Sequence, residues 1–398
     1  MSRSWIVLAV TLAIQAMISA AALVGPVLAP DIAPTIGLRA ALVGIQIGLI
    51  YAAAATSSLF SGNMIRRLGA VRLSQLALLF AAAGLGLSLI GTALAIAFGA
   101  LLIGIGYGAV TPASSHLLAR STPKHRMGLV FSLKQTGVPL GGILAGLALP
   151  PLTLTFGWRV AVSISIALCL LVALSAQSVR GGLDADRSPG RGPKMRDAMR
   201  TLLADPALRR LALVSFVFAA MQLILTGYLV TFLTEARGLS LATAGTIMAI
   251  SQAAGVTGRL AWGWCADRLL DARTLMTIIA ALSAICSALF AIESGSGTVL
   301  LIALTSAIFG AAAIGWNGVF LAEVARIAPE GSVGAATGAA LFMTYAGVVA
   351  GPPVFAGIVS NAGYIAGFSA SAVVMAAMAA FLMLDSGHSS HDPEESPT

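Results

Sequence analysis

Long stretches without a charged residue dominate the chain. Ten such runs occur, at residues 4–30, 40–65, 73–119, 135–158, 160–179, 211–234, 238–258, 274–292, 294–322 and 331–384. Because a membrane-spanning helix needs about 20 apolar residues, the runs 73–119 and 331–384 each predict two helices, with turns near Gly91-Thr92 and Asn361-Ala362-Gly363. The alternation typical of a membrane β-barrel is absent. The pattern predicts an all-α membrane protein with twelve transmembrane helices.

The composition supports the same class. Hydrophobic residues make up 58% of the 398 residues, charged residues make up 10%, and the mean hydropathy is +0.95. Soluble proteins carry about 25% charged residues, so a soluble enzyme, a nucleic-acid-binding protein and a disordered chain are excluded. The three cysteines, Cys169, Cys265 and Cys286, lie in or beside apolar stretches. Their spacing indicates neither a disulfide framework nor a metal site, and we expect no cofactor.

The basic residues gather on one side of the predicted helices. With a cytoplasmic N-terminus, eighteen Lys and Arg lie on the inner side and three on the outer side. The inner residues are Arg3, Arg66, Arg67, Arg72, Arg120, Lys124, Arg126, Arg180, Arg187, Arg191, Lys194, Arg196, Arg200, Arg209, Arg210, Arg268, Arg273 and Arg326; the outer ones are Arg39, Arg159 and Arg237. The positive-inside rule then predicts a multi-pass protein of the cell (inner) membrane with both termini in the cytoplasm. The net charge of +8 reflects this topology and requires no nucleic-acid partner.

The start of the chain imitates a secretory signal peptide, because Arg3 precedes an apolar run. That run continues to Pro30, which is long enough to cross a bilayer. We therefore expect an uncleaved first helix rather than a signal peptide.

The two halves of the chain repeat each other. Gly104, Arg120, Pro123, Gly128, Gly141 and Gly157 recur 206 residues later as Gly310, Arg326, Pro329, Gly334, Gly347 and Gly363. Gly62, Arg67 and Arg72 recur 201 residues later as Gly263, Arg268 and Arg273. Repeats of this kind are typical of alternating-access carriers. We predict six-helix bundles at residues 1–178 and 207–384, a cytoplasmic linker at 179–206 and a disordered cytoplasmic tail at 385–398.

The charged linker holds one further pattern. Pro193 to Asp205 fits a basic amphipathic helix. Such a helix lies on an anionic membrane surface, and a solvated tether is the equally open alternative.

A short loop motif carries a family resemblance. Gly263-Trp264-Cys265-Ala266-Asp267-Arg268, with Arg273 beyond it, resembles the loop between helices 8 and 9 of the major facilitator superfamily. The matching first-half loop, residues 62–69, keeps the Gly and Arg positions but has Arg66 in place of the family's Asp, and its helix-4 partner position is Ala100. The resemblance implies a fold of two pseudo-symmetric six-helix bundles. It also implies gating roles for Gly62, Arg67, Gly263, Asp267, Arg268 and Arg273, with Asp267 as the better candidate for the gating lock.

Glycines at helical spacing mark predicted packing faces. Gly137-x-x-x-Gly141 and Gly142-x-x-x-Gly146 are typical of small-residue interfaces that let helices approach. The segment 137–142 is also similar to the family's antiporter signature, but its spacing does not fit.

Two basic residues lie inside predicted spans. Lys134 is eight residues beyond Arg126, and Arg259 is eight residues before Asp267, which places each about 12 Å deep. Burial there costs about 2.5–3.5 kcal/mol, yet every nearby acid belongs to a membrane edge: Asp31, Glu235 and Glu293 outside, Asp267, Asp271, Glu323 and Glu330 inside. Two cations without a fixed counter-ion favour an anionic substrate; the alternative is that each side chain extends to the inner edge, or pairs with helix carbonyls for purely structural reasons.

The spacing from Arg259 to Asp267-Arg268 is similar to the oxalate/formate, monocarboxylate and cyanate-type carriers. The resemblance implies that Arg259 clasps a substrate carboxylate. The helix-11 Lys of the oxalate carriers and the helix-1 Lys of the monocarboxylate carriers have no counterpart, so Lys134 is the candidate substitute. Polar residues within spans complete the predicted binding set, each of which either orients a substrate or hydrogen-bonds a neighbouring helix: Gln15, Gln252, Asn317, Tyr228 and Tyr345, with Gln46, Thr111 and Gln222 as further candidates of the same kind.

These observations predict a secondary active transporter of small organic anions, in particular monocarboxylates, that works by alternating access as a monomer. Three modes of coupling stay open: proton symport with the substrate, titration of Lys134, or anion exchange. An exporter of drugs or amphiphilic metabolites is the alternative, and a sensor without flux is a third. A membrane enzyme is not supported, because the sequence contains no catalytic constellation.

Overall fold

The computed structural model describes residues 3–121, 130, 133–185, 205–292, 298–327 and 333–384. Within these residues every regular element is helical, and the elements in chain order are α1 (Arg3–Thr35), η1 (Ala40–Leu42), α2 (Val43–Leu68), α3 (Ala70–Ser88), α4 (Ala93–Ser121), α6 (Gly137–Phe156), α7 (Trp158–Ser175), α8 (Gln177–Leu183), α10 (Pro206–Glu235), α11 (Leu241–Arg268), α12 (Ala272–Ile292), α13 (Val299–Gly315), α14 (Asn317–Ile327) and α15 (Val333–Leu384). The predicted tail at 385–398 and residues 193–204 of the predicted amphipathic helix lie outside the described residues.

The helices account for twelve membrane crossings. Ten segments of the described chain are long and apolar enough to cross a membrane, and one of them joins α13 to α14. α11 is not one of these ten segments. Its 28 residues are nevertheless enough to cross a membrane, and Arg259 lies within it. α15 has 52 residues and contains a non-helical Gly363 (φ 80°, ψ 174°), so it makes two crossings. The predicted fold of twelve helices, and the predicted turns near Gly91 and Gly363, are confirmed.

Glycines with positive φ make the turns at one end of the molecule. They are Gly37, Gly91, Gly157, Gly238 and Gly363, and we call this end the glycine-turn end. A residue with a Cβ is strained at such backbone angles. Gly157 (φ 84°, ψ 156°) and Gly363 (φ 80°, ψ 174°) form one of the predicted repeat pairs, and they have nearly the same conformation. We call the opposite end, where α2 passes to α3 and α11 to α12, the arginine-rich end.

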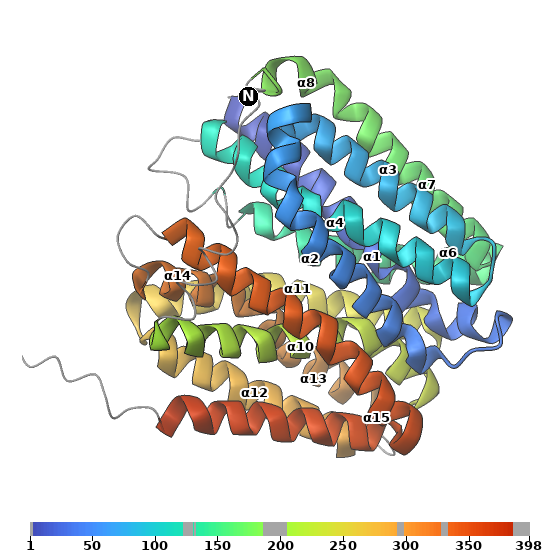
Figure 1. Ribbon diagram of the computed structural model, residues 1–398. Helices are drawn as coiled ribbons and strands as arrows, with labels where there is room; N and C mark the ends of the chain where they lie inside the picture. The colour runs from blue at the N-terminus through green and yellow to red at the C-terminus, as the bar shows by residue number, and fades with distance from the viewer. Residues whose placement is uncertain are drawn as a thin grey trace, which may run out of the picture.

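Figure 1 shows α1–α8 and α10–α15 as two bundles that lie one above the other and converge toward the glycine-turn end. The bundles meet where α2 packs on α15, α6 on α11 and α1 on α10. Small residues permit these contacts. A Cβ on Gly137 or Gly141 would meet α1, and one on Gly142 or Gly146 would meet α11. The two predicted glycine motifs of α6 are thus confirmed as packing faces, one within its own bundle and one between the bundles.

Hydrogen bonds join the bundles at the glycine-turn end. The Tyr228 hydroxyl lies 2.9 Å from the Ala41 carbonyl of the first bundle and 3.1 Å from the Pro352 carbonyl of its own bundle. Arg39 Nη1 donates to the Ser360 carbonyl at 2.7 Å. A Cβ on Gly44 would overlap both the Tyr228 hydroxyl and Pro352. The structure is therefore closed at this end.

Candidate substrate site between the bundles

Arg259 links the two bundles from the middle of α11. Its Nε donates to the Ile314 carbonyl at 3.0 Å, at the break between α13 and α14. Its Nη1 donates to the Gln135 carbonyl of the first bundle at 2.7 Å. One guanidinium therefore holds a backbone acceptor in each bundle.

The Gln135 carbonyl is available because of a proline. In a helix it would accept from the N–H of residue 139, and Pro139 has none. The chain turns at Thr136, whose N–H bonds the Leu133 carbonyl at 3.1 Å, and α6 begins at Gly137. A buried carbonyl without a partner is costly, and the guanidinium of Arg259 supplies the missing donor.

Lys134 lies beside this contact and is 1% exposed. Its Nζ is 3.2 Å from the Gln135 Oε1 and 3.4 Å from the Thr111 hydroxyl. Thr111 in turn donates to Gln15 Oε1 at 3.3 Å, and Gln15, fully buried on α1, donates to Ser19 at 3.4 Å. Gln135 thus contacts both cations, Lys134 through its side chain and Arg259 through its backbone.

Neutral groups alone accept hydrogen bonds from these two cations within the described residues. Every partner of Lys134 and Arg259 is an amide, a hydroxyl or a backbone carbonyl. Two adjacent cations repel each other strongly in a low-dielectric interior. The arrangement is therefore electrostatically suited to an anion.

Three tyrosines lie near one another, and one of them lies near Arg259. The rings of Tyr51 and Tyr107 meet edge to face with centroids 5.2 Å apart. Tyr345 lies within electrostatic range of both rings, and Tyr107 lies within electrostatic range of Arg259. These side chains come from α2, α4 and α15, so both bundles contribute to the aromatic group. Of the three, Tyr345 alone belongs to the binding set predicted from the sequence.

Other predicted binding residues lie around or away from this network. Asn317 Nδ2 and Trp316 Nε1 both donate to Gln222 Oε1, at 3.2 and 3.0 Å, at the α13–α14 break next to Ile314. Gln252 is 3% exposed and packs on Gly142 at the α6–α11 contact.

Tyr228 is fully buried, and its hydroxyl belongs to the closure of the glycine-turn end rather than to the Lys134–Arg259 network.

The predicted gating residues lie at the arginine-rich end. Gly62 and Gly263 have open space where a Cβ would stand, and Arg67 and Arg268 are exposed. Arg273 reaches across its bundle, where Nε donates to the Leu382 carbonyl at 2.6 Å and Nη2 to the Met383 carbonyl at 3.1 Å. The side chain of Asp267 lies outside the described residues, so the expected lock at that position stays a prediction.

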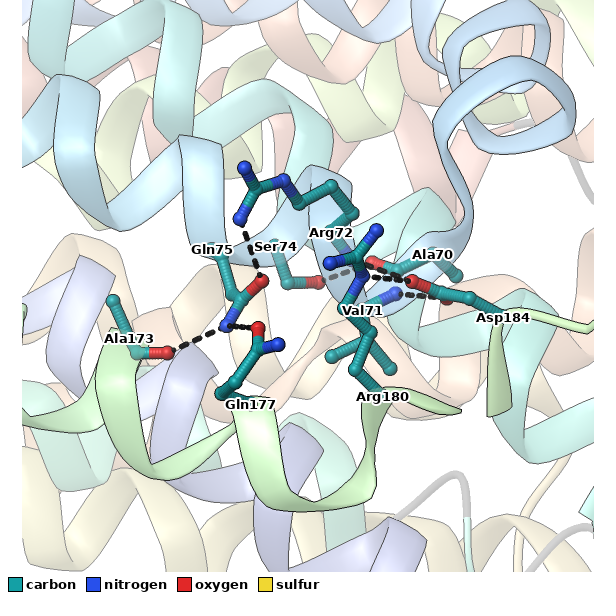
Figure 2. Close-up of polar contacts among 9 residues, drawn as sticks. All are labelled: Ala70, Val71, Arg72, Ser74, Gln75, Ala173, Gln177, Arg180 and Asp184. Atoms are coloured by element: carbon teal, nitrogen blue, oxygen red, sulfur yellow. Dashed lines mark hydrogen bonds and ion pairs between the residues drawn. The ribbon is translucent and has the colours of Figure 1, made fainter. Parts of the chain in front are cut away.

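An unpredicted acid contact occupies the same end of the first bundle. Asp184, at the end of α8, accepts from the N–H of Val71 at 2.8 Å and of Arg72 at 3.0 Å. Figure 2 shows the carboxylate against the first turn of α3, with Arg180 beside it at 3.7 Å. Farther along α3, Gln75 donates to Gln177 at 3.0 Å and to the Ala173 carbonyl at 2.9 Å (Figure 2). The first residues of the predicted linker are therefore packed onto the bundle.

The residues of these sites that were not predicted from the sequence include Gln135, Tyr51, Tyr107 and Asp184. Gln135 acts partly through its backbone, and Pro139 four residues later is the signal that exposes its carbonyl. Asp184 lies in a charged segment that has the composition of a tether. Nothing in the chain near Tyr51 or Tyr107 distinguishes them from tyrosines that simply pack between helices.

Comparison with known proteins agrees with this architecture. Residues 8–352 match the Major Facilitator Superfamily. An uncharacterized MFS-type transporter of Mycobacterium tuberculosis is 26% identical over 261 residues, which are 66% of this chain and 58% of that protein. A protein of Mycolicibacterium smegmatis named as an MFS-type efflux pump is 30% identical over 217 residues, 52% of this chain and 50% of the relative. The matches thus span between 50% and 58% of the length of these relatives.

Solved structures share the fold at low identity. A D-xylose-proton symporter superposes with a TM-score of 0.74 at 16% identity, covering 94% of this chain and 96% of that chain. A bacterial homolog of the human lysosomal transporter Spinster, in an inward-facing and occupied conformation, gives a TM-score of 0.71 at 18% identity over 96% and 95% of the two chains. The family match extends over most of the sequence, and its members are transporters rather than enzymes. This multi-pass membrane protein belongs to the Major Facilitator Superfamily.

Proposed function

We propose that the protein is a secondary active transporter of small organic anions, in particular monocarboxylates. The observation that carries the proposal is the meeting of Lys134 and Arg259, one from each bundle, at Gln135, with only neutral hydrogen-bond partners among the described residues. The similarity of the Arg259 spacing to the oxalate/formate, monocarboxylate and cyanate-type carriers supports the same substrate class.

The geometry also indicates which edge of Arg259 an anion would use. The single hydrogen on Nε is committed to the Ile314 carbonyl. The remaining donors are on the two terminal nitrogens, and Nη1 points to Gln135, the residue that Lys134 also contacts. A carboxylate bound in two places by the planar fork would therefore lie between the two cations. Since Lys134 is 1% exposed, this place suits a small anion.

Alternating access gives the contacts between the bundles a role. The structure is closed at the glycine-turn end by Tyr228, Arg39 and Gly44. If the arginine-rich end faces the cytoplasm, as the positive-inside rule predicts, the closed end is the outer one. The residues 1–178 would rock against 207–384 around the α2–α15 and α6–α11 contacts, in a single chain that acts as a monomer.

A thermal-shift screen tests the substrate class. The detergent-purified protein is heated with small mono- and dicarboxylates, cyanate and amphiphilic cations. A ligand present at 100 times its Kd stabilises the folded protein by about 2.7 kcal/mol, so a bound anion gives a clear rise in Tm. Arg259→Ala and Lys134→Ala are expected to abolish that rise.

Arg159→Ala is the matched control. Arg159 is also a basic residue of a helix but stacks on Trp158 at 4.4 Å, next to the turn at Gly157. It should keep the full response to anions. Stabilisation by cations only, or an anion response that survives both Arg259→Ala and Lys134→Ala, would overturn the anion site.

Flux into proteoliposomes then separates the modes of coupling. Uptake of radiolabelled monocarboxylate that rises with an imposed inward proton gradient supports proton symport or titration of Lys134. Uptake that needs unlabelled anion inside the vesicle and ignores the gradient supports exchange. Absence of flux together with specific binding would instead favour a sensor.

A second candidate function is export of drugs or amphiphilic metabolites. The observation that favours it is the M. smegmatis relative, which is named as an efflux pump. Neutral partners around Lys134 and Arg259 offer nothing that attracts a cationic drug. Extrusion of a fluorescent lipophilic cation from loaded vesicles, unaffected by Arg259→Ala, would support this function over the first.

A further inference from the structure

A proline-freed carbonyl connects the bundles at the proposed anion site. Pro139 cannot donate to Gln135, and the next N–H, that of Leu140, bonds the Thr136 carbonyl at 3.0 Å. The Gln135 carbonyl therefore has no N–H partner in its own helix, and Arg259 Nη1 donates to it at 2.7 Å. This is the shortest hydrogen bond that either cation makes within the described residues.

The rest of the Arg259 side chain is fixed from its own bundle. Trp262, one turn along α11, donates to the Ala311 carbonyl at 2.8 Å, and Arg259 Nε donates to Ile314 at 3.0 Å. A Cβ on Gly255 would overlap Ile314, so α11 lies close against the end of α13. With Nε anchored in this way, Nη1 is the part of the guanidinium that reaches across to the other bundle.

We propose that Pro139 is a positioning residue for the anion site: by withholding an N–H it leaves the Gln135 carbonyl to Arg259, which ties the two bundles together while no anion is bound. The inference rests on the proposed function in taking Arg259 as the anion-binding cation. Two carbonyl dipoles, of Gln135 and Ile314, serve as acceptors for the buried charge. An arriving carboxylate competes for Nη1, so that binding loosens the tie and the bundles become free to move.

Pro139→Ala tests the tie in the anion-free protein. Alanine supplies the missing N–H and lets the helix continue through Thr136, which directs the Gln135 carbonyl along the helix axis and away from α11. Spin labels at Thr92 and Leu300, both exposed and on opposite bundles at the glycine-turn end, report the opening of that end in a cysteine-free background. The parent should give a single distance, and Pro139→Ala should add a longer one, with about a tenfold change in the ratio of the two populations.

Pro151→Ala is the matched control, because it restores an N–H in the same helix toward Leu147, which is 52% exposed on the outer surface of the bundle. It should leave the distance distribution unchanged. Arg259→Lys keeps the charge but cannot hold two carbonyls in a fixed fork, and it should also add the longer population. This second variant tests the tie if Pro139→Ala fails to fold.

A distance distribution in Pro139→Ala and Arg259→Lys that matches the parent overturns the proposed tie, whatever the substrate. An equal change in Pro151→Ala overturns it too, because the effect would then belong to the helix rather than to the Gln135 carbonyl. Failure of the proposed function reads differently: no anion would shift the Tm of the parent, while the labels could still report the tie.

Discussion

The two bundles secure the start of their third helix by different chemistry. In the second bundle, Asp271 precedes α12 and caps it directly, with Thr274 donating its N–H at 3.0 Å and its hydroxyl at 2.6 Å. In the first bundle the residue before α3 is Gly69, which has no side chain, and the carboxylate comes from Asp184, 113 residues away from Val71. Both halves of the repeated fold therefore place a carboxylate acceptor at the N-terminus of the third helix. The residue that supplies it lies at a different position in each half of the sequence.

The difference also changes how the sixth helix of each bundle is held. Asp184 joins the end of α8 to the N-terminus of α3, where an acid is favoured by the helix dipole. In the second bundle Arg273, at the start of α12, donates to the carbonyls of Leu382 and Met383 at the C-terminus of α15, where a base is favoured. In the first bundle a carboxylate accepts from N–H groups to join the sixth helix to the third. In the second bundle a guanidinium donates to carbonyls to make the same connection.

Among these changes, substitution of Gly69 in the first bundle should cause the largest loss of stability. Gly69 has φ 93° and ψ 154°, and a Cβ there would overlap the Asp184 carboxyl group. Gly69→Ala adds backbone strain and displaces the cap, so we expect a loss of about 3 kcal/mol in the free energy of unfolding. Thermal unfolding in detergent measures it.

Gly157→Ala is the control, because Gly157 has nearly the same backbone angles (φ 84°, ψ 156°) and open space at its Cβ position. It should cost only the strain, about 1–2 kcal/mol. Equal losses in the two variants would show that the Asp184 contact adds nothing.

Removal of the carboxylate itself should cost less. Asp184 is 2% exposed, and Asp184→Ala leaves the N–H groups of Val71 and Arg72 without their acceptor. We expect a loss of about 2 kcal/mol, again from thermal unfolding. Asp184→Asn keeps one acceptor oxygen and should recover part of it.

Arg273→Ala is the corresponding change in the second bundle. The Arg273 side chain is more accessible than Asp184, and water can replace it at the α15 carbonyls. A loss as large as that of Asp184→Ala would contradict the inference that the two junctions differ in burial.

The sequence predicts the helices well and the cross-chain contacts poorly. Twelve crossings follow from the uncharged runs because hydrophobic length is a local property. Lys134 and Arg259 stand out because an isolated charge in a span needs a reason. Tyr228 shows the opposite case. From the sequence alone, a polar residue in a span that faces a cavity cannot be distinguished from one that, like Tyr228, closes the contact between the bundles.

Asp184 and Gln135 needed the structure for a different reason. Asp184 acts on residues more than 100 positions earlier, and no local pattern records that distance. Gln135 binds Arg259 through a main-chain oxygen, so its residue type carries no information about the contact. Only the absence of an N–H at Pro139 could have indicated it.

The smallest expected effect is the pH dependence of Tm that comes from Asp271, which is the more exposed of the two capping carboxylates. Hydrogen bonds from the Thr274 hydroxyl and N–H lower the pKa of Asp271 below its ordinary value. A carboxyl group with a lowered pKa in the folded state adds stability above its unfolded pKa, and that stability disappears as the pH falls through the folded pKa. Asp271 is exposed, so solvent screens the effect, and the Tm of the parent should fall only slightly more than that of Asp271→Asn between pH 5 and pH 3. Parallel Tm curves for the parent and Asp271→Asn over this range would contradict the cap. Because Asp271→Asn retains one of the two oxygens that accept from Thr274, the comparison removes the charge of the cap while it keeps part of its hydrogen bonding.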